Sequence, residues 1–208
     1  MKKITAILCI FALLFSLTAC AQAKPEDTVN KFCNAMKTFD LETIKACTAD
    51  SFEKGDLEEI SGNGMPQQFE ELLKTWAFAM EYTVGTAAIE EETAKVPVTF
   101  TYPDHSEAIS KAFGSLFVAL LMESLGGESS ELTDEHFNEV FMQCIDEALA
   151  KETEAAPLTL ETELDLVKVG KEWKISGAPE NLFDVMTGNV LNAFKEIEQD
   201  LSLFIQEP

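Results

Sequence analysis

The sequence predicts an α+β fold, because apolar residues recur with a helical spacing in some segments and with a strand spacing in others. Helical spacing dominates from Pro25 to Met80 and from Ser106 to Leu149. Apolar and polar residues alternate from Met80 to Tyr102 and from Leu158 to Ile175, which is the period of a half-buried strand. The expected order is therefore helices, a strand pair, two inserted helices, a long hairpin and a final helix.

Three helices are expected before the first strand. Pro25 is tolerated at a first helical position, and two acidic residues follow it in the first turn, where the helix dipole favours them. Asp40 is expected to cap a second, short helix, and Pro66 to start a third. Between these two, the glycine-rich stretch from Lys54 to Met65 predicts a loop. The expected inward residues are Val29, Phe32, Cys33 and Met36, then Leu41, Ile44 and Cys47, then Phe69, Leu72, Leu73, Trp76 and Met80.

A strand pair is expected next, with inward side chains at alternate positions. Gly85 stands where a bulge could redirect the first strand. Pro97 cannot donate a hydrogen bond to a sheet, so it predicts an edge position or a bulge in the second strand. Pro103 and Asp104 then end the sheet.

An inserted pair of helices is predicted over residues 105–152, because each carries a broad apolar stripe that needs a packing partner. The hairpin over residues 158–175 follows. The apolar seam of the final helix runs from Phe183 to Phe204, and Gly188-Asn189 interrupts its helical propensity and predicts a kink. The expected stripe of the first inserted helix is Phe113, Leu116, Phe117, Leu120 and Leu121.

The N-terminus has the pattern of an export signal. Lys2 and Lys3 precede an apolar stretch from Ile4 to Ala19 that is too short to be read first as a membrane-spanning helix. This stretch ends in Leu17-Thr18-Ala19-Cys20, which resembles the lipobox of bacterial lipoproteins. The resemblance implies that the Cys20 sulfur receives a diacylglyceryl group and that residues 1–19, the signal peptide, are removed. Two acyl chains, at about 0.8 kcal/mol for each buried methylene, give stable anchoring.

The expected location is therefore outside the cytoplasm, at the outer face of the cell membrane or at an outer membrane if one exists. Residues 20–24 form the lipidated tether, which reaches at most about 18 Å when extended. Residues 25–208 are expected to form a single domain.

The charge of the chain excludes several partners. After removal of the signal, 13 lysines, no arginine and 37 acidic residues remain, a formal charge of −24. Binding to nucleic acid depends on cationic groups that neutralise phosphates, so no nucleic-acid partner is predicted. The same charge leaves the lipid on Cys20, rather than a basic face, as the contact with the membrane.

Three cysteines remain for the domain. Cys33 and Cys47 lie on two successive expected helices, so a disulfide between them is one interpretation, since disulfides persist outside the cytoplasm. The alternative is that both are small buried apolar residues, as free cysteines usually are. Cys144 fits the apolar stripe of the second inserted helix and needs no other role.

Two stretches carry a resemblance to a known superfamily. Residues Pro25 to Phe32 with Phe39 to Lys45 are similar to the start, and Val169 to Ser176 to the closing hairpin, of NTF2-like domains, in which a curved sheet wraps around helices into a cone. A two-helix insertion after Phe100–Asp104 and the tail Leu182–Asn189 further resemble a group of bacterial lipoproteins of unknown function. The resemblance implies an NTF2-like cone with N-terminal helices on a curved antiparallel sheet, an inserted helical pair and a long C-terminal helix. It carries over no catalytic residues.

No nucleophile elbow, phosphate loop or metal-binding motif is present, so no cofactor and no metal are predicted. His136 is expected on a helix surface. Some NTF2-like enzymes use a His and an Asp in the cone, so one hypothesis is an isomerase or hydrolase that uses His105 with a carboxylate. Against it, Asp104 is expected to cap the following helix, and neighbouring strand residues point to opposite faces.

The favoured hypothesis is a non-enzymatic binding or interaction module for a small apolar ligand or a cell-envelope partner. An open cone mouth lined by aromatic residues would bind such a ligand. The alternative is that these side chains fill the core. The expected lining residues are Tyr82, Phe100, Tyr102, His105 and Trp173.

Overall fold

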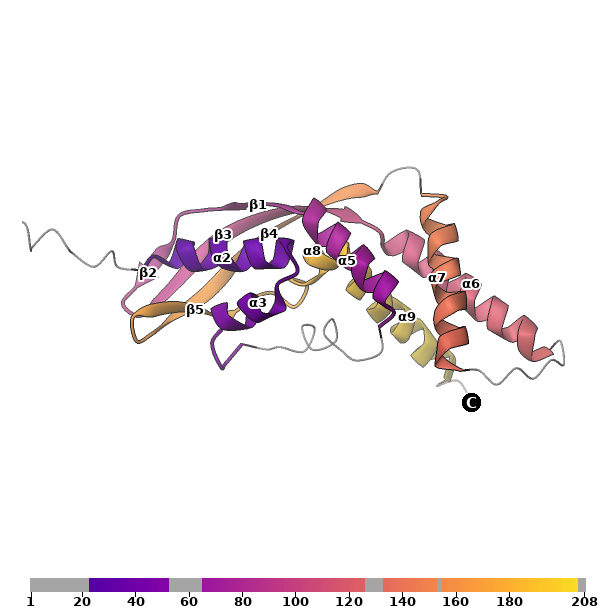
Figure 1. Ribbon diagram of the computed structural model, residues 1–208. Helices are drawn as coiled ribbons and strands as arrows, with labels where there is room; N and C mark the ends of the chain where they lie inside the picture. The colour runs from indigo at the N-terminus through magenta and orange to yellow at the C-terminus, as the bar shows by residue number, and fades with distance from the viewer. Residues whose placement is uncertain (1–22, 53–64, 126–132, 153–154, 206–208) are drawn as a thin grey trace, which may run out of the picture.

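An open antiparallel sheet organises the chain in the computed structural model, which describes residues 23–52, 65–125, 133–152 and 155–205 (Figure 1). Within these residues the fold is α+β, with seven helices and five strands. Cys20, the residue expected to carry the lipid, lies outside the described residues. The strands are β1 (Glu81–Val84), β2 (Ala88–Glu90), β3 (Thr93–Asp104), β4 (Ala156–Val169) and β5 (Glu172–Gly177).

The strand β3 is the centre of the sheet. It pairs with β1 and β2 on one side and with β4 on the other, and β4 pairs with β5. Because side chains alternate along a strand, the even-numbered positions of β3 from Ala94 to Tyr102 all face the core. The buried positions are Ala94, Val96, Val98, Phe100 and Tyr102.

Pro97 does not lie on an edge strand, since β3 has partners on both sides. It lies opposite the break between β1 and β2, where the Gly85 N–H donates to the Pro97 carbonyl at 2.7 Å. The amide nitrogen of Pro97 faces the same gap, where no ladder hydrogen bond is required of it. The expected interruption at Gly85 is thus present in the strand next to Pro97.

Three helices precede the sheet, as predicted: α2 (Pro25–Lys37), α3 (Leu41–Cys47) and α5 (Gln67–Ala79). The Asp40 carboxylate caps α3 by accepting from the Thr43 N–H at 3.0 Å. These helices pack against the sheet, with Phe32, Met36 and Ile44 fully buried. Together they form the helical layer on one face of the long strands (Figure 1).

Two long helices, α6 (Ser106–Leu125) and α7 (Asp134–Leu149), connect β3 to β4 and pack against each other. They lie beyond one end of the sheet, and the start of α2 and the β2 strand lie at the other end (Figure 1). The molecule is therefore elongated, with the first described residues and the α6–α7 pair far apart.

The final helical segment is broken into α8 (Asp184–Thr187) and α9 (Val190–Ile205). The break is at Gly188 and Asn189, which have positive φ angles of 62° and 66°. The sequence correctly predicts an interruption here, but two successive left-handed residues separate the helices instead of kinking one. Helix α9 packs against α6, where the rings of Phe113 and Phe194 meet edge to face at 5.1 Å.

Candidate functional site

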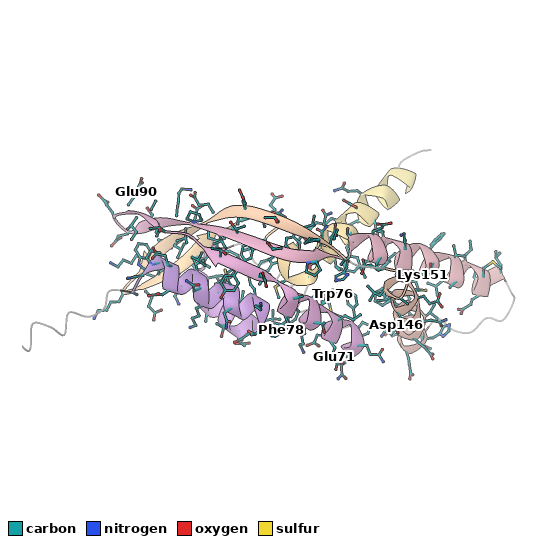
Figure 2. All side chains as sticks on the ribbon, turned by 90° about the horizontal axis from the view of Figure 1, so that it is seen from above. Glu71, Trp76, Phe78, Glu90, Asp146 and Lys151 are labelled. Atoms are coloured by element: carbon teal, nitrogen blue, oxygen red, sulfur yellow. The ribbon has the colours of Figure 1, made fainter. Side chains whose placement is uncertain are left out.

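The candidate histidine lies where four parts of the chain meet, a region that we call the His105 junction. It contains Asp104 at the end of β3 and His105 just before α6, Glu152 after α7, Trp76 of α5, and Gly188-Asn189 between α8 and α9. Figure 2 places Trp76 at the end of the long strands from which α6 begins, and Glu90 at the opposite end of the sheet.

His105 is held on three sides. Its Nδ1 lies 2.7 Å from Oε2 of Glu152, and these two side chains are only 12% and 19% exposed. Its ring stacks on Trp76 with the ring centroids 4.5 Å apart. Its backbone N–H donates to the Gly188 carbonyl at 2.9 Å.

Gly188 is needed at this point for two reasons. Its positive φ is one that other residues rarely adopt. A Cβ on Gly188 would also lie 2.9 Å from Cδ2 of His105, closer than the ring allows. The αL turn between α8 and α9 thereby brings the backbone against the edge of the imidazole.

Asp104 links three segments through one oxygen. Its Oδ1 accepts from the Ser106 N–H at 3.1 Å, from the Ser106 hydroxyl at 2.6 Å and from the Asn189 amide at 3.0 Å. Burial alone would raise the pKa of Asp104, but the hydrogen bonds from Ser106 and Asn189 outweigh it and lower that pKa. Asp104 is thus an ionised carboxylate next to the start of α6. It accepts from the first N–H of the helix, as expected of a capping side chain, although His105 occupies the N-cap position itself.

A groove of about 1060 Å³ runs between α6 and α7 and ends at the junction. Asp104 and Glu152 of the junction line the groove, whereas His105 does not. Its floor has small side chains, and its rim is charged. The floor includes Ala108, Gly114, Ser115, Ala119, Cys144 and Ala148, and the rim includes Glu107, Lys111, Glu147 and Lys151.

A second cavity, of about 110 Å³, lies between α5 and α9 and is lined by Met65, Phe69, Leu73, Thr187, Val190, Leu191 and Phe194. Its volume is far below the range of about 300–1,000 Å³ that is usual for ligand sites. The α6–α7 groove is therefore the better candidate of the two.

The outer face of α6 is apolar and exposed. Between 45% and 73% of the surface of five large side chains is accessible, and these residues are Phe117, Val118, Leu121, Met122 and Leu125. The expected single stripe of α6 is therefore wrong in part, because Leu116 is buried while Phe117 and Leu121 face outward. Among the described helices, α6 is the one long and apolar enough to cross a membrane. Length and composition are weak evidence for a membrane span, because core helices of soluble proteins meet the same criteria.

The residues expected to line a cone are not gathered at a cavity. Phe100 is fully buried, Tyr102 is 6% exposed, and the Tyr82 hydroxyl donates to the Asn30 carbonyl at 3.4 Å. Trp173 donates from Nε1 to the Ala23 carbonyl at 2.9 Å. None of these four residues, nor His105, lines either cavity described above.

The three cysteines of the domain are buried free thiols in the structure. Burial raises the pKa of Cys33 to about 12. Burial likewise raises the pKa of Cys47 and of Cys144. Within the described residues no group of three or more ligating side chains is placed to hold a metal ion.

His136 connects the far ends of the two inserted helices. Its Nε2 lies 2.9 Å from Oε2 of Glu123, and the Thr133 hydroxyl caps α7 by accepting from the His136 N–H at 3.2 Å. The hydrogen bond to Glu123 raises the pKa of His136. His136 therefore lies on the helix surface, as predicted, but has a specific partner.

Sequence reasoning missed the groove and the partners of His105. The sequence marked Gly188-Asn189 only as a helix interruption. It gave no reason to pair Glu152 with His105, because the two residues are 47 positions apart in the chain. Comparison with known proteins adds no assignment, since no protein-family model, curated protein or solved structure matches the chain.

Proposed function

We propose that this chain is an exported lipoprotein, anchored through lipid on Cys20, that acts as a non-enzymatic binding or interaction module. The support for its location is the apolar signal that ends in Leu17-Thr18-Ala19-Cys20. The bond from Trp173 to the Ala23 carbonyl supports a short tether, because it attaches the chain to β5 three residues after Cys20. Three residues span at most about 11 Å, so the β5 end of the domain would lie next to the bilayer.

We further propose an NTF2-like relationship for the domain. It is supported by the order of three helices, a strand pair, an inserted helical pair and a closing hairpin. The two stretches that resemble lipoproteins of unknown function also meet in space, where Asn189 donates to Asp104 at 3.0 Å. Both stretches therefore contribute residues to the His105 junction.

The proposed binding site is the α6–α7 groove. The observation that carries this proposal is a groove of about 1060 Å³ whose inner wall is fixed by the His105 junction. A small-residue floor admits close approach of an apolar chain or helix, and the charged rim orients it. The α6–α7 pair lies at the end of the sheet opposite the start of α2 (Figure 1). The groove between these helices is therefore far from the proposed anchor, where it is free to meet a cell-envelope partner.

A cysteine protection experiment tests this proposal on the full chain. Ser115→Cys places a thiol on the groove floor, and Phe78→Cys places one on α5 at a site that is 68% exposed and outside the groove lining. If the groove is about 90% occupied in isolated membranes, Ser115→Cys should react with a polar maleimide about tenfold more slowly there than after purification and dilution in detergent. Phe78→Cys should react equally in both preparations.

Equal rates for Ser115→Cys in both preparations would contradict the proposal. Native mass spectrometry of the purified full chain then separates a retained small molecule, seen as added mass, from a protein partner that is lost on dilution. The parent chain, in which the described cysteines Cys33, Cys47 and Cys144 are buried, supplies the background reactivity.

One observation favours the acid–base alternative, namely the His105–Glu152 contact of 2.7 Å. A carboxylate on Nδ1 fixes the tautomer of an imidazole and leaves Nε2 for proton transfer. The packing of this ring between Trp76 and Gly188, outside the groove lining, supports a positioning role instead. Turnover of a substrate by the parent chain that is abolished by His105→Gln without loss of fold would establish the alternative.

A further inference from the structure

Helix α6 is apolar on two opposite faces. Its inner face, with Ile109, Ala112 and Leu116, is buried in the domain. Its outer face, with Val118, Leu121 and Leu125, remains exposed. A helix that is hydrophobic all round is normally buried on all sides, so the outer face requires a partner that the described part of the chain does not supply.

The outer face has the spacing of a helix-pairing seam. Lys111, Gly114, Val118, Leu121 and Leu125 follow one another at alternating steps of three and four residues, and all are exposed. Steps of three and four keep side chains on one line along a helix and permit knobs-into-holes packing with a second helix. Three residues of the seam, Lys111, Gly114 and Val118, also line the α6–α7 groove.

Gly114 has no evident role in the packing of its own chain. A Cβ added there would meet nothing within 4 Å, and glycine weakens the middle of a helix relative to alanine. The missing side chain instead leaves a hole on the outer face next to Ser115. Such holes let the backbone of another helix approach closely or accept a large side chain from it.

We propose that the partner is a second copy of this chain, paired with its α6 antiparallel to the first and crossing it at Val118. This inference rests on the proposed interaction role of the groove and names its partner. In that arrangement Met122 and Leu121 of each copy lie opposite Gly114 and Ser115 of the other, so large side chains meet small ones twice by symmetry.

Charge supports the same arrangement. Lys111, whose Nζ also lies 2.6 Å from Oε1 of Glu107 on its own helix, comes to the carboxyl end of the partner helix. There the helix dipole is negative and the last turn of α6 contains no basic residue. A bilayer is the less suitable occupant, because helices that lie in a membrane surface are rich in lysine and arginine on their polar face. In α6 the only basic residue is Lys111.

Crosslinking of the full chain in membranes tests the register. Val118→Cys lies on the proposed two-fold axis and should give a covalent dimer with a short bismaleimide, whereas Phe78→Cys should not. Two differently tagged chains, one with Gly114→Cys and one with Met122→Cys, should crosslink mainly to each other. Two Gly114→Cys chains should crosslink poorly, because eight residues at about 1.5 Å each separate the thiols along the axis by about 12 Å.

Gly114→Leu separates pairing from folding. It fills the proposed hole and should reduce the Val118→Cys dimer about tenfold or more. Since the site is open in the single chain and leucine favours helix, the far-ultraviolet circular dichroism should not change. A dimer yield unaffected by Gly114→Leu would overturn the proposal.

The two proposals can fail separately. Protection of Ser115→Cys without a Val118→Cys dimer would keep the groove as a binding site and reject the second copy as its partner. Quenching of a bimane on Val118→Cys by brominated lipids, without a dimer, would place α6 in the bilayer and also reject it. A Val118→Cys dimer with the predicted Gly114–Met122 preference supports the inference.

Discussion

Nδ1 of His105 lies 2.7 Å from Oε2 of Glu152, and this contact joins the start of α6 to the residues that follow α7. The two ends of the inserted helical pair are thereby tied together at the sheet. Because His105 also stacks on Trp76, the tie extends to α5 and the N-terminal layer. The wall of the groove is consequently positioned by the core of the domain.

Loss of this contact should destabilise the domain. We expect Glu152→Ala to lower the free energy of unfolding by about 1–3 kcal/mol, because it leaves a mostly buried imidazole nitrogen without its partner. Glu152→Gln keeps a hydrogen-bonding side chain and should have a smaller effect. Urea unfolding followed by tryptophan fluorescence measures both. Equal stabilities of the parent and Glu152→Ala would show that the contact is not a structural tie.

Gly188→Ala, which adds one methyl group, should strongly lower the free energy of unfolding. The positive φ of Gly188 and the 2.9 Å approach of its Cβ to Cδ2 of His105 act together, and we expect a loss of about 2–4 kcal/mol. Gly170→Ala is a matched control, since Gly170 has a φ of 66° but nothing within 4 Å of an added Cβ. It should cost about 1 kcal/mol. Similar losses for the two variants would argue against the ring contact.

Asp104 should contribute to acid unfolding. Burial tends to raise the pKa of Asp104, but the hydrogen bonds from Ser106 and Asn189 have the larger combined effect. The pKa of Asp104 is therefore lower than its ordinary value of 3.8. The stability it contributes is therefore fully present above that value and is lost as the pH falls through the lower, folded pKa. Asp104→Asn should flatten the decrease in unfolding free energy between about pH 5 and pH 2 relative to the parent. An identical acid profile would contradict this assignment.

The parts of the fold that sequence predicted best depend on local physics. Pro25, Asp40 and Pro66 mark helix starts because capping and proline geometry act within one turn. The alternation in β3 reports burial directly, since every second side chain faces the core. The break at Gly188-Asn189 was likewise predicted from local conformational preference.

The site depends on contacts between distant residues and could not be predicted in this way. His105 and Glu152 are 47 positions apart, and Asp104 and Asn189 are 85 apart. The sequence singled out His105 but gave no means of choosing its carboxylate. Nor could periodicity decide which face of α6 is inward, because both faces of this helix are apolar.

Cys33 should be chemically inert in the folded chain. Burial raises the pKa of its thiol to about 12, so almost no thiolate exists near neutral pH, and the side chain is inaccessible. Labelling of native protein by iodoacetamide, read by peptide mass spectrometry, should modify Cys33 only at the rate of unfolding. Phe78→Cys, at a site that is 68% exposed and outside the groove, supplies an exposed reference thiol in the same chain. Comparable rates for the two thiols would show that α2 opens readily.

His136 should make the tip of the α6–α7 pair sensitive to pH. The hydrogen bond and charge of Glu123 raise the pKa of His136 above its ordinary value of 6.5. The resulting stabilisation is complete below that value and is lost as the pH rises through the higher, folded pKa. After correction for intrinsic exchange, amide hydrogen exchange at the carboxyl end of α6 should be slower at about pH 5.5 than at about pH 8.5, because the protonated ring attracts Glu123 more strongly than the neutral ring does. His136→Gln should remove this difference while leaving exchange in β3 unchanged, and a pH dependence that persists in His136→Gln would assign the effect to another group.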